Sequence, residues 1–249
     1  MHTIVAWSES VAADTTQTNL NAVPDEHVRV EGDNIMVPDF NRIIGYYANG
    51  ENIQNVQLSS PSLRRLALVD IAPVENSALP ESPPDPICRP LSPLTLDIDE
   101  SLSALAGNAD ASSAHQENVV LFLSNGPVTP VNGEIITIRT TATAPATAYA
   151  WANAPLVFSQ TLPVGTYDLV GARCEQANTI AFRFVFIGGI WRPGMLAVPD
   201  IDYDDYEYSR FGALGVWGTF SHNRPPSVDF FGDGTGGSAV IYLDLIKRG

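Results

Sequence analysis

A run of large apolar side chains constrains the fold of this chain more than any other sequence feature. Between Ile180 and Ile187, every second residue is Ile or Phe, and in an extended strand these residues share one face. The intervening residues are mostly apolar too. β-Branched and aromatic residues favour strands, and a strand that is apolar on both faces must be covered on both. The run therefore predicts a central strand of a β-sandwich. Arg183, within the run, is expected to meet a buried acid or backbone carbonyls.

The residues around this run are also predicted to form strands that are separated by turns. The segment 156–198 is predicted to form strand, Pro-Gly turn, strand, polar turn and the central strand, and it ends at an Arg-Pro-Gly corner. Turn residues punctuate the other short strands from residue 118 onwards. Many short strands and few helices predict an all-β fold, a jelly-roll β-sandwich with one or two short helices. The further strands are expected at 118–125, 134–143, 227–231 and 238–246.

Two segments are predicted to be short helices. Phe40, Ile43, Ile44 and Tyr47 have helical spacing and are followed by Asn49-Gly50, although residues 43–48 are equally compatible with a strand. Residues 101–107 resemble a helix with Asp99 as its N-cap.

A proline-rich stretch provides the predicted domain boundary. Seven prolines fall between Pro73 and Pro93, and their missing N–H donors exclude a helix or a central strand there. We therefore expect an N-terminal jelly-roll-like sandwich at 1–92, which ends in the connector 73–93, and a second jelly roll at 93–249. A chain of 249 residues also leaves room for one elaborated sandwich.

The charge balance excludes some partners. The chain has 28 acidic and 13 basic residues, a formal charge of -15. Affinity for nucleic acid comes largely from Lys and Arg, so direct binding of DNA or RNA is not expected. The apolar run at Thr3–Trp7 is too short for a signal peptide, and no window is long enough for a membrane helix. We expect a soluble protein without either segment.

The densest group of acids lies at 200–208. Asp200, Asp202 and Asp204 alternate as the first oxygen ligands of a Ca²⁺ loop do, but the following glycine and distal glutamate are missing. A Ca²⁺ site at these three residues is therefore one hypothesis, and a solvated acidic loop is the other. No other cofactor is indicated.

Aromatic residues suggest a second class of function. Sugar-binding modules stack ligands on exposed aromatic side chains, so a carbohydrate-binding or adhesion module is the alternative function. Its stacking candidates are Trp151, Trp191, Trp217, Tyr203, Tyr206 and Tyr208.

No catalytic motif is present, and the chain is predicted not to be an enzyme. The four histidines, His2, His27, His115 and His222, have no nucleophile at a suitable spacing. Residues 231–237 are glycine-rich but lack a phosphate-binding lysine, which favours a hairpin loop. Cys88 and Cys174 are expected to be buried thiols. Acid pairs for glycoside hydrolysis could be drawn from Asp97, Asp99, Glu100 and Asp229, but chance alone supplies such pairs.

Taken together, the chain resembles the small double-jelly-roll major capsid proteins of tailless icosahedral phages and viruses. The likeness rests on the early N-terminal strand, the proline-rich connector, the strands at 118–125 and 179–189 and the long loop at 191–220. It implies a virion structural protein, a major capsid subunit that forms homotrimers and tiles a shell, or a minor capsid, spike or fibre protein. Implied partners are further copies, other virion proteins, vertex or spike proteins and an internal membrane. No residue role is carried over, because no short motif defines the family.

Overall fold

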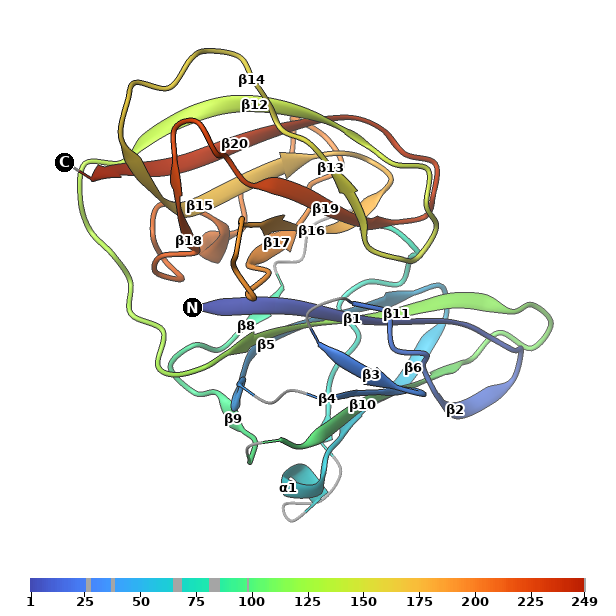
Figure 1. Ribbon diagram of the computed structural model, residues 1–249. Coiled ribbons are helices and arrows are strands. Elements are labelled where there is room, and N and C mark those ends of the chain that lie inside the picture. Colours follow the sequence, from blue (N-terminus) through green and yellow to red (C-terminus); the bar gives the residue numbers. More distant parts are fainter. Residues whose placement is uncertain (26–27, 37–38, 65–68, 81–85, 98, 249) are drawn as a thin grey trace. The chain divides into compact units, whose positions relative to one another are not determined.

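The computed structural model describes residues 1–249 except 26–27, 37–38, 65–68, 81–85, 98 and 249 (Figure 1). The chain forms two compact units. Unit 1 comprises Met1–Ile4 and Pro127–Gly249, and unit 2 comprises Val5–Gly126. Strand β1 therefore gives its first residues to unit 1 and the remainder to unit 2.

Unit 2 is built from two antiparallel sheets. The first has the order β1-β11-β5-β8, and β9 also pairs with β5; the second contains β2-β10-β6-β7, and the β3-β4 hairpin extends it beside β10. The single turn of helix α1 (Pro61–Arg64) follows β6. The strands are β1 (His2–Val11), β2 (Thr15–Asn19), β3 (Arg29–Glu31), β4 (Asn34–Met36), β5 (Arg42–Gly50), β6 (Ile53–Ser59), β7 (Val69–Asp70), β8 (Ile87–Cys88), β9 (Leu94–Thr95), β10 (Ser101–Asn108) and β11 (His115–Ser124).

Unit 1 also has two sheets. One has the order β14-β12-β20-β15-β18 and the other β13-β19-β16-β17. The 3-10 helix η1 (Glu207–Ser209) lies in the long connection between β17 and β18. The strands are β12 (Ile136–Ala144), β13 (Ala152–Ala154), β14 (Val157–Phe158), β15 (Thr166–Glu175), β16 (Thr179–Val185), β17 (Gly194–Leu196), β18 (Gly218–Ser221), β19 (Ser227–Gly232) and β20 (Gly237–Arg248).

The eight principal strands of each unit follow one order. Once the β3-β4 hairpin and strands β9 and β14 are set aside, one sheet contains the first, eighth, third and sixth strands of the unit, and the other contains the second, seventh, fourth and fifth. This is the strand order of a jelly roll, which comprises two sheets and two Greek keys. The predicted all-β jelly-roll class is confirmed.

The central strand predicted in the apolar run is β16. It lies between β19 and β17, and its residues from Thr179 to Phe184 are buried. The strand ends at Val185, so Ile187 falls outside it and is 71% exposed. The buried side chains on both faces explain why this strand could be recognised from composition alone.

Both predicted helices are strands. Residues Arg42–Gly50 form β5, which pairs with β11 from Gly50↔Glu117 to Arg42↔Ser124. Residues Ser101–Asn108 form β10, which is paired on both edges, with β6 on one side and with β2 and β4 on the other. Helical spacing in so short a segment is a weak signal, and two-sided pairing overrides it.

The division of the chain differs from the expected boundary at 92/93. Strands β10 and β11, which follow the proline-rich stretch, pair with β6 and β5, which precede it. The stretch is therefore inside unit 2, where it contributes β8 at a sheet edge, a position that tolerates nearby prolines. The units divide instead after Gly126, in the Asn125-Gly126-Pro127 turn.

The glycine-rich residues 231–237 do not form a hairpin. They connect β19 to β20, and these strands belong to different sheets of unit 1. Backbone freedom is required here, because Gly234, Gly236 and Gly237 all have positive φ.

Candidate assembly surface

The loop between β16 and β17 presents apolar side chains to solvent. Ile187 is 71% exposed and Ile190 is 55% exposed, with Gly188 at φ +73° between them. The buried Arg192 holds the loop, because its Nη1 donates to the carbonyls of Gly189 (2.9 Å) and Trp191 (3.0 Å). The exposed apolar residues are thus carried on a fixed turn.

An apolar hollow of about 210 Å³ lies beside this turn. Trp217 forms part of its wall and is almost fully buried, with the His2 ring packed edge-on at 5.0 Å. Burial lowers the pKa of His2 to about 4, so this ring is neutral at physiological pH. The side chains that line the hollow are uncharged, and the α-amino group of Met1 is the charged group beside it. Its lining comprises Met1, Phe186, Ile187, Gly188, Gly189, Trp191, Trp217, Gly218 and Thr219. We call the loop 186–191 and this hollow the apolar surface.

Two arginines pair with one acid of the acidic loop, Asp205. Asp205 bridges Arg173 (2.8 Å) and Arg210 (2.5 Å), and Arg210 also forms a two-pronged ion pair with Asp244 (2.7 and 2.9 Å). Arg173 further donates to the carbonyls of Asp200 and Ile201, both at 3.3 Å. These contacts fix the loop to β15 and β20 of unit 1.

The hypothesis of a Ca²⁺ site gains nothing from this geometry. In the described part of the chain, no group of three or more His, Cys, Asp or Glu side chains is placed to hold a metal ion. Asp200, Asp202 and Asp204 are thus not gathered into such a group. The acid of this loop that forms ion pairs with arginines is Asp205. The alternating spacing of the aspartates did not identify it.

The sugar-stacking candidates do not form an exposed platform. Trp217 and Tyr206 are buried, and Trp151 lies beneath the Arg183 guanidinium at 4.0 Å. The other candidates, Trp191, Tyr203 and Tyr208, are half-buried. The arrangement does not favour the carbohydrate-binding alternative.

The partner expected for Arg183 is Asp229. The Arg183 Nε donates to Asp229 Oδ2 at 2.9 Å, and Nη1 donates to the Ile4 carbonyl at 3.3 Å. Asn153 donates to the other carboxylate oxygen at 2.7 Å. The prediction of a buried acid is confirmed, and Asp229 has a structural role here.

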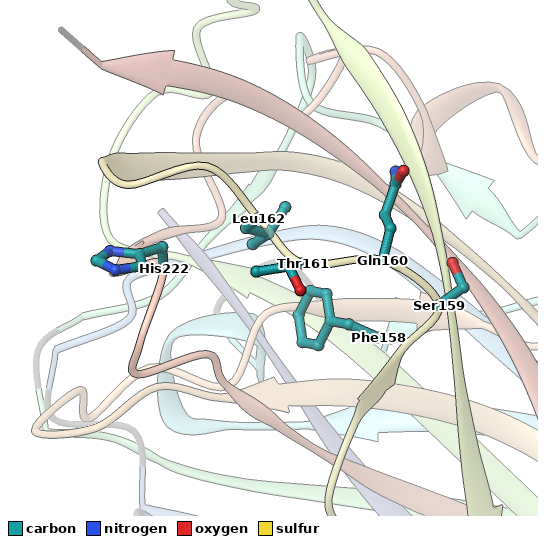
Figure 2. Close-up of a pocket in the computed structure, with 6 residues that line it drawn as sticks. All are labelled: Phe158, Ser159, Gln160, Thr161, Leu162 and His222. Atoms are coloured by element: carbon teal, nitrogen blue, oxygen red, sulfur yellow. The ribbon is translucent and has the colours of Figure 1, made fainter.

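A second hollow, of about 300 Å³, contains a histidine and hydroxyl groups (Figure 2). His222 lies at one end and Ser159 at the other, and Phe158, Gln160, Thr161 and Leu162 complete the lining. The Ser159 hydroxyl donates to the Arg139 carbonyl at 2.6 Å, and the His222 Nδ1 accepts from the Gly165 N–H at 3.4 Å. These two side chains do not form a nucleophile and base pair.

The other catalytic candidates are also dispersed. Glu100 is buried and accepts from Ser60 and Ser62, whereas Asp97 and Asp99 are exposed. His115 contacts Glu51 and Asp110, and His27 lies outside the described residues. Cys88 is half-buried and Cys174 is buried, and no disulfide joins them.

Comparisons with known proteins add little. No protein-family model matches the chain, and no curated protein matches it. Among solved structures, it is similar to the major capsid protein P2 of bacteriophage PM2, at 12% identity and a TM-score of 0.25, over 100% of this chain and 98% of that chain. Because the TM-score is so low, neither fold nor function is inferred from this likeness. No helix in the described ranges is long and apolar enough to cross a membrane.

Proposed function

We propose that this protein is a virion structural protein, the major capsid subunit, and that its two units form a double jelly roll. The observation that carries the proposal is the shared strand order, since both units have the same eight-strand jelly-roll arrangement within one chain. Jelly rolls are characteristic of viral capsid, lectin and cupin domains. The buried aromatic residues do not favour the lectin, and the duplicated strand order within one chain is the reason to propose the shell subunit. In this proposal the protein resides in the virion.

Charge indicates where copies would meet. A chain of formal charge -15 repels its own copies, so a contact must use surface without net negative charge. Residues 186–191 contain no charged side chain, and the hollow beside them is lined by uncharged side chains and contains no acid. Contiguous exposed apolar patches are typical of association sites. We assign the apolar surface to contact with a second copy, within a homotrimer that tiles an icosahedral shell. Other virion proteins, vertex or spike proteins and an internal membrane are the further partners, and nucleic acid is not.

The double variant Ile187→Asp with Ile190→Asp tests this assignment. It places two carboxylates in the apolar contact and should weaken trimer formation by about 2 kcal/mol or more, roughly 30-fold in Kd. Sedimentation velocity over a range of concentrations measures the change. Val164→Asp is the matched control, because Val164 is 78% exposed but is not part of the apolar surface.

Two results would contradict the proposal. A wild-type protein that stays monomeric at every concentration and between pH 5 and 8 would exclude the shell subunit, and glycan binding would be measured next. If the double variant forms trimers as tightly as the wild type, the protein still self-associates, but the apolar surface is not the contact.

A further inference from the structure

Glu117 is a buried acid whose carboxyl group has no hydrogen-bond partner in the described part of the chain. It lies on β11 with 0% exposure, and neither carboxyl oxygen has a hydrogen-bond partner among the described residues. Burying an unpaired carboxylate is costly, whereas the neutral acid is tolerated far better. The structure of this site therefore suits a protonated Glu117.

The neighbouring strand makes room for this side chain. Glu117 is paired with Gly50 at the end of β5, and the two strands run side by side (Figure 1). A Cβ atom on Gly50 would overlap the Glu117 carboxyl group. The carboxyl group therefore lies directly over the last residue of β5, where the turn to β6 begins.

Three turns meet at this end of unit 2. The Ala109 N–H donates to the Asn52 carbonyl at 2.9 Å, and the Asp14 N–H donates to the Asp110 carbonyl at 2.7 Å. His115, two residues before Glu117, contacts Glu51 at 2.9 Å and Asp110 at 3.2 Å. The β1–β2, β5–β6 and β10–β11 turns are thus joined beside the buried acid.

The charges around Glu117 are mostly negative. Glu51, Asp110 and Asp14 lie on the three turns, and Glu75 lies on the segment paired with Asn49 and contacts the Tyr47 hydroxyl. Burial first, and then the charge of Glu51, raises the pKa of Glu117 to about 8. Hydrogen bonds from Ser112, His115 and Ser113 hold the pKa of Asp110 well below its usual range, so this neighbour stays ionised. In the described part of unit 2, His115 is the one titratable group at this cluster able to carry positive charge.

We propose that Glu117 is a proton-controlled lock of unit 2, which keeps the three turns closed while its carboxyl group is protonated and releases them when it ionises. Among the described residues the ionised group has no hydrogen-bond donor, and Glu51 repels it, so it must leave the interior. Its departure separates the β5–β6 turn from the β10–β11 turn. This inference concerns a single subunit and does not depend on the proposed function.

The sign of the pH effect follows from the proton count. The ordinary pKa of a glutamic acid is 4.5, and the pKa of Glu117 in the folded state is about 8. Between these two pH values the folded state holds one proton that the unfolded state has lost. The Glu117 contribution therefore favours folding most at low pH and is lost as the pH rises, by about tenfold in the folding equilibrium constant per pH unit.

The test compares the wild type with Glu117→Gln, which keeps the shape and removes the titration. The variant should be more stable than the wild type at pH 8, by about tenfold or more in the folding constant, and the advantage should shrink towards pH 5. Hydrogen exchange, corrected for intrinsic rates, should show residues 50–53 and 108–114 losing protection at high pH in the wild type alone. Glu31→Gln, an exposed acid of the same unit, is the control and should follow the wild type.

Direct titration keeps the proposal testable if the variant does not fold. In wild-type protein labelled with ¹³C at the glutamate carboxyl carbons, one signal should titrate far above the others. The proposal is overturned if every glutamate titrates near pH 4.5, or if the stability of Glu117→Gln differs from that of the wild type by the same factor at pH 5 and pH 8.

Discussion

Replacing Asp244 with alanine is expected to lower the free energy of unfolding by about 3–5 kcal/mol. The Asp244 side chain is fully buried on β20 and accepts from Arg210, from the Thr137 hydroxyl at 2.7 Å and from the Phe211 N–H at 3.0 Å. Without this carboxylate, the Arg210 guanidinium loses its two-pronged ion pair. The Thr137 hydroxyl and the Phe211 N–H also lose their acceptor. Gly171 has no side chain at this point, and a Cβ there would come within 2.8 Å of the carboxylate, so the site is built around Asp244.

Urea denaturation followed by tryptophan fluorescence measures this loss. Asp202→Ala, an exposed acid of the 200–208 loop, is the control and should change stability by less than about 0.5 kcal/mol. The Asp244 variant should also become sensitive to limited proteolysis in residues 198–212, because Arg210 no longer ties that segment to β20. Equal stability of the two variants would show that Asp244 is not the anchor.

Replacing Trp217 with alanine is also expected to cost about 3–5 kcal/mol. Trp217 is 1% exposed and contacts the rings of His2 and Phe184, so the variant leaves a cavity that its neighbours cannot fill. Thermal unfolding and urea denaturation both measure the effect. Trp191→Ala is the control: Trp191 lines the same hollow but is half-buried, and its removal should cost less than half as much. Equal losses would mean that Trp217 does not support the core.

The parts of the fold that could be predicted were those with a strong local pattern. The apolar run of β16 requires cover on both faces wherever it occurs, so it identified a central strand. The segment that became β5 carries Ile43, Ile44 and Tyr47 at spacings that suit a helix face, and only its pairing with β11 decides for a strand. The expected domain boundary at 92/93 differs from the observed division for a related reason. The prolines do not reveal that β10 and β11, which follow them, pair with β6 and β5, which precede them.

The same limit applies to the side-chain sites. Arg183 in an apolar strand demanded a buried acid, but nothing in the sequence indicated that Asp229, 46 residues away, supplies it. The acidic loop was recognised, yet its partners Arg173 and Arg210 approach it from β15 and from the end of the loop itself. Glu117 could not be identified from the sequence, because the predicted strand begins at Asn118 and an acid just outside a strand is ordinarily solvated.

The division of β1 between the two units has a consequence for the order of folding during synthesis. The His2 ring contacts the Gly194 carbonyl at 3.1 Å, and the Ile4 N–H donates to the Arg192 carbonyl at 2.9 Å. These partners leave the ribosome long after residues 2–4, whereas every strand of unit 2 is complete once Gly126 has emerged. Domains fold as units, N-terminal ones first, and contacts distant in sequence form slowly. Residues 2–4 can therefore pair only after β16 and β17 have been synthesised, which makes their incorporation a late step in the folding of unit 1.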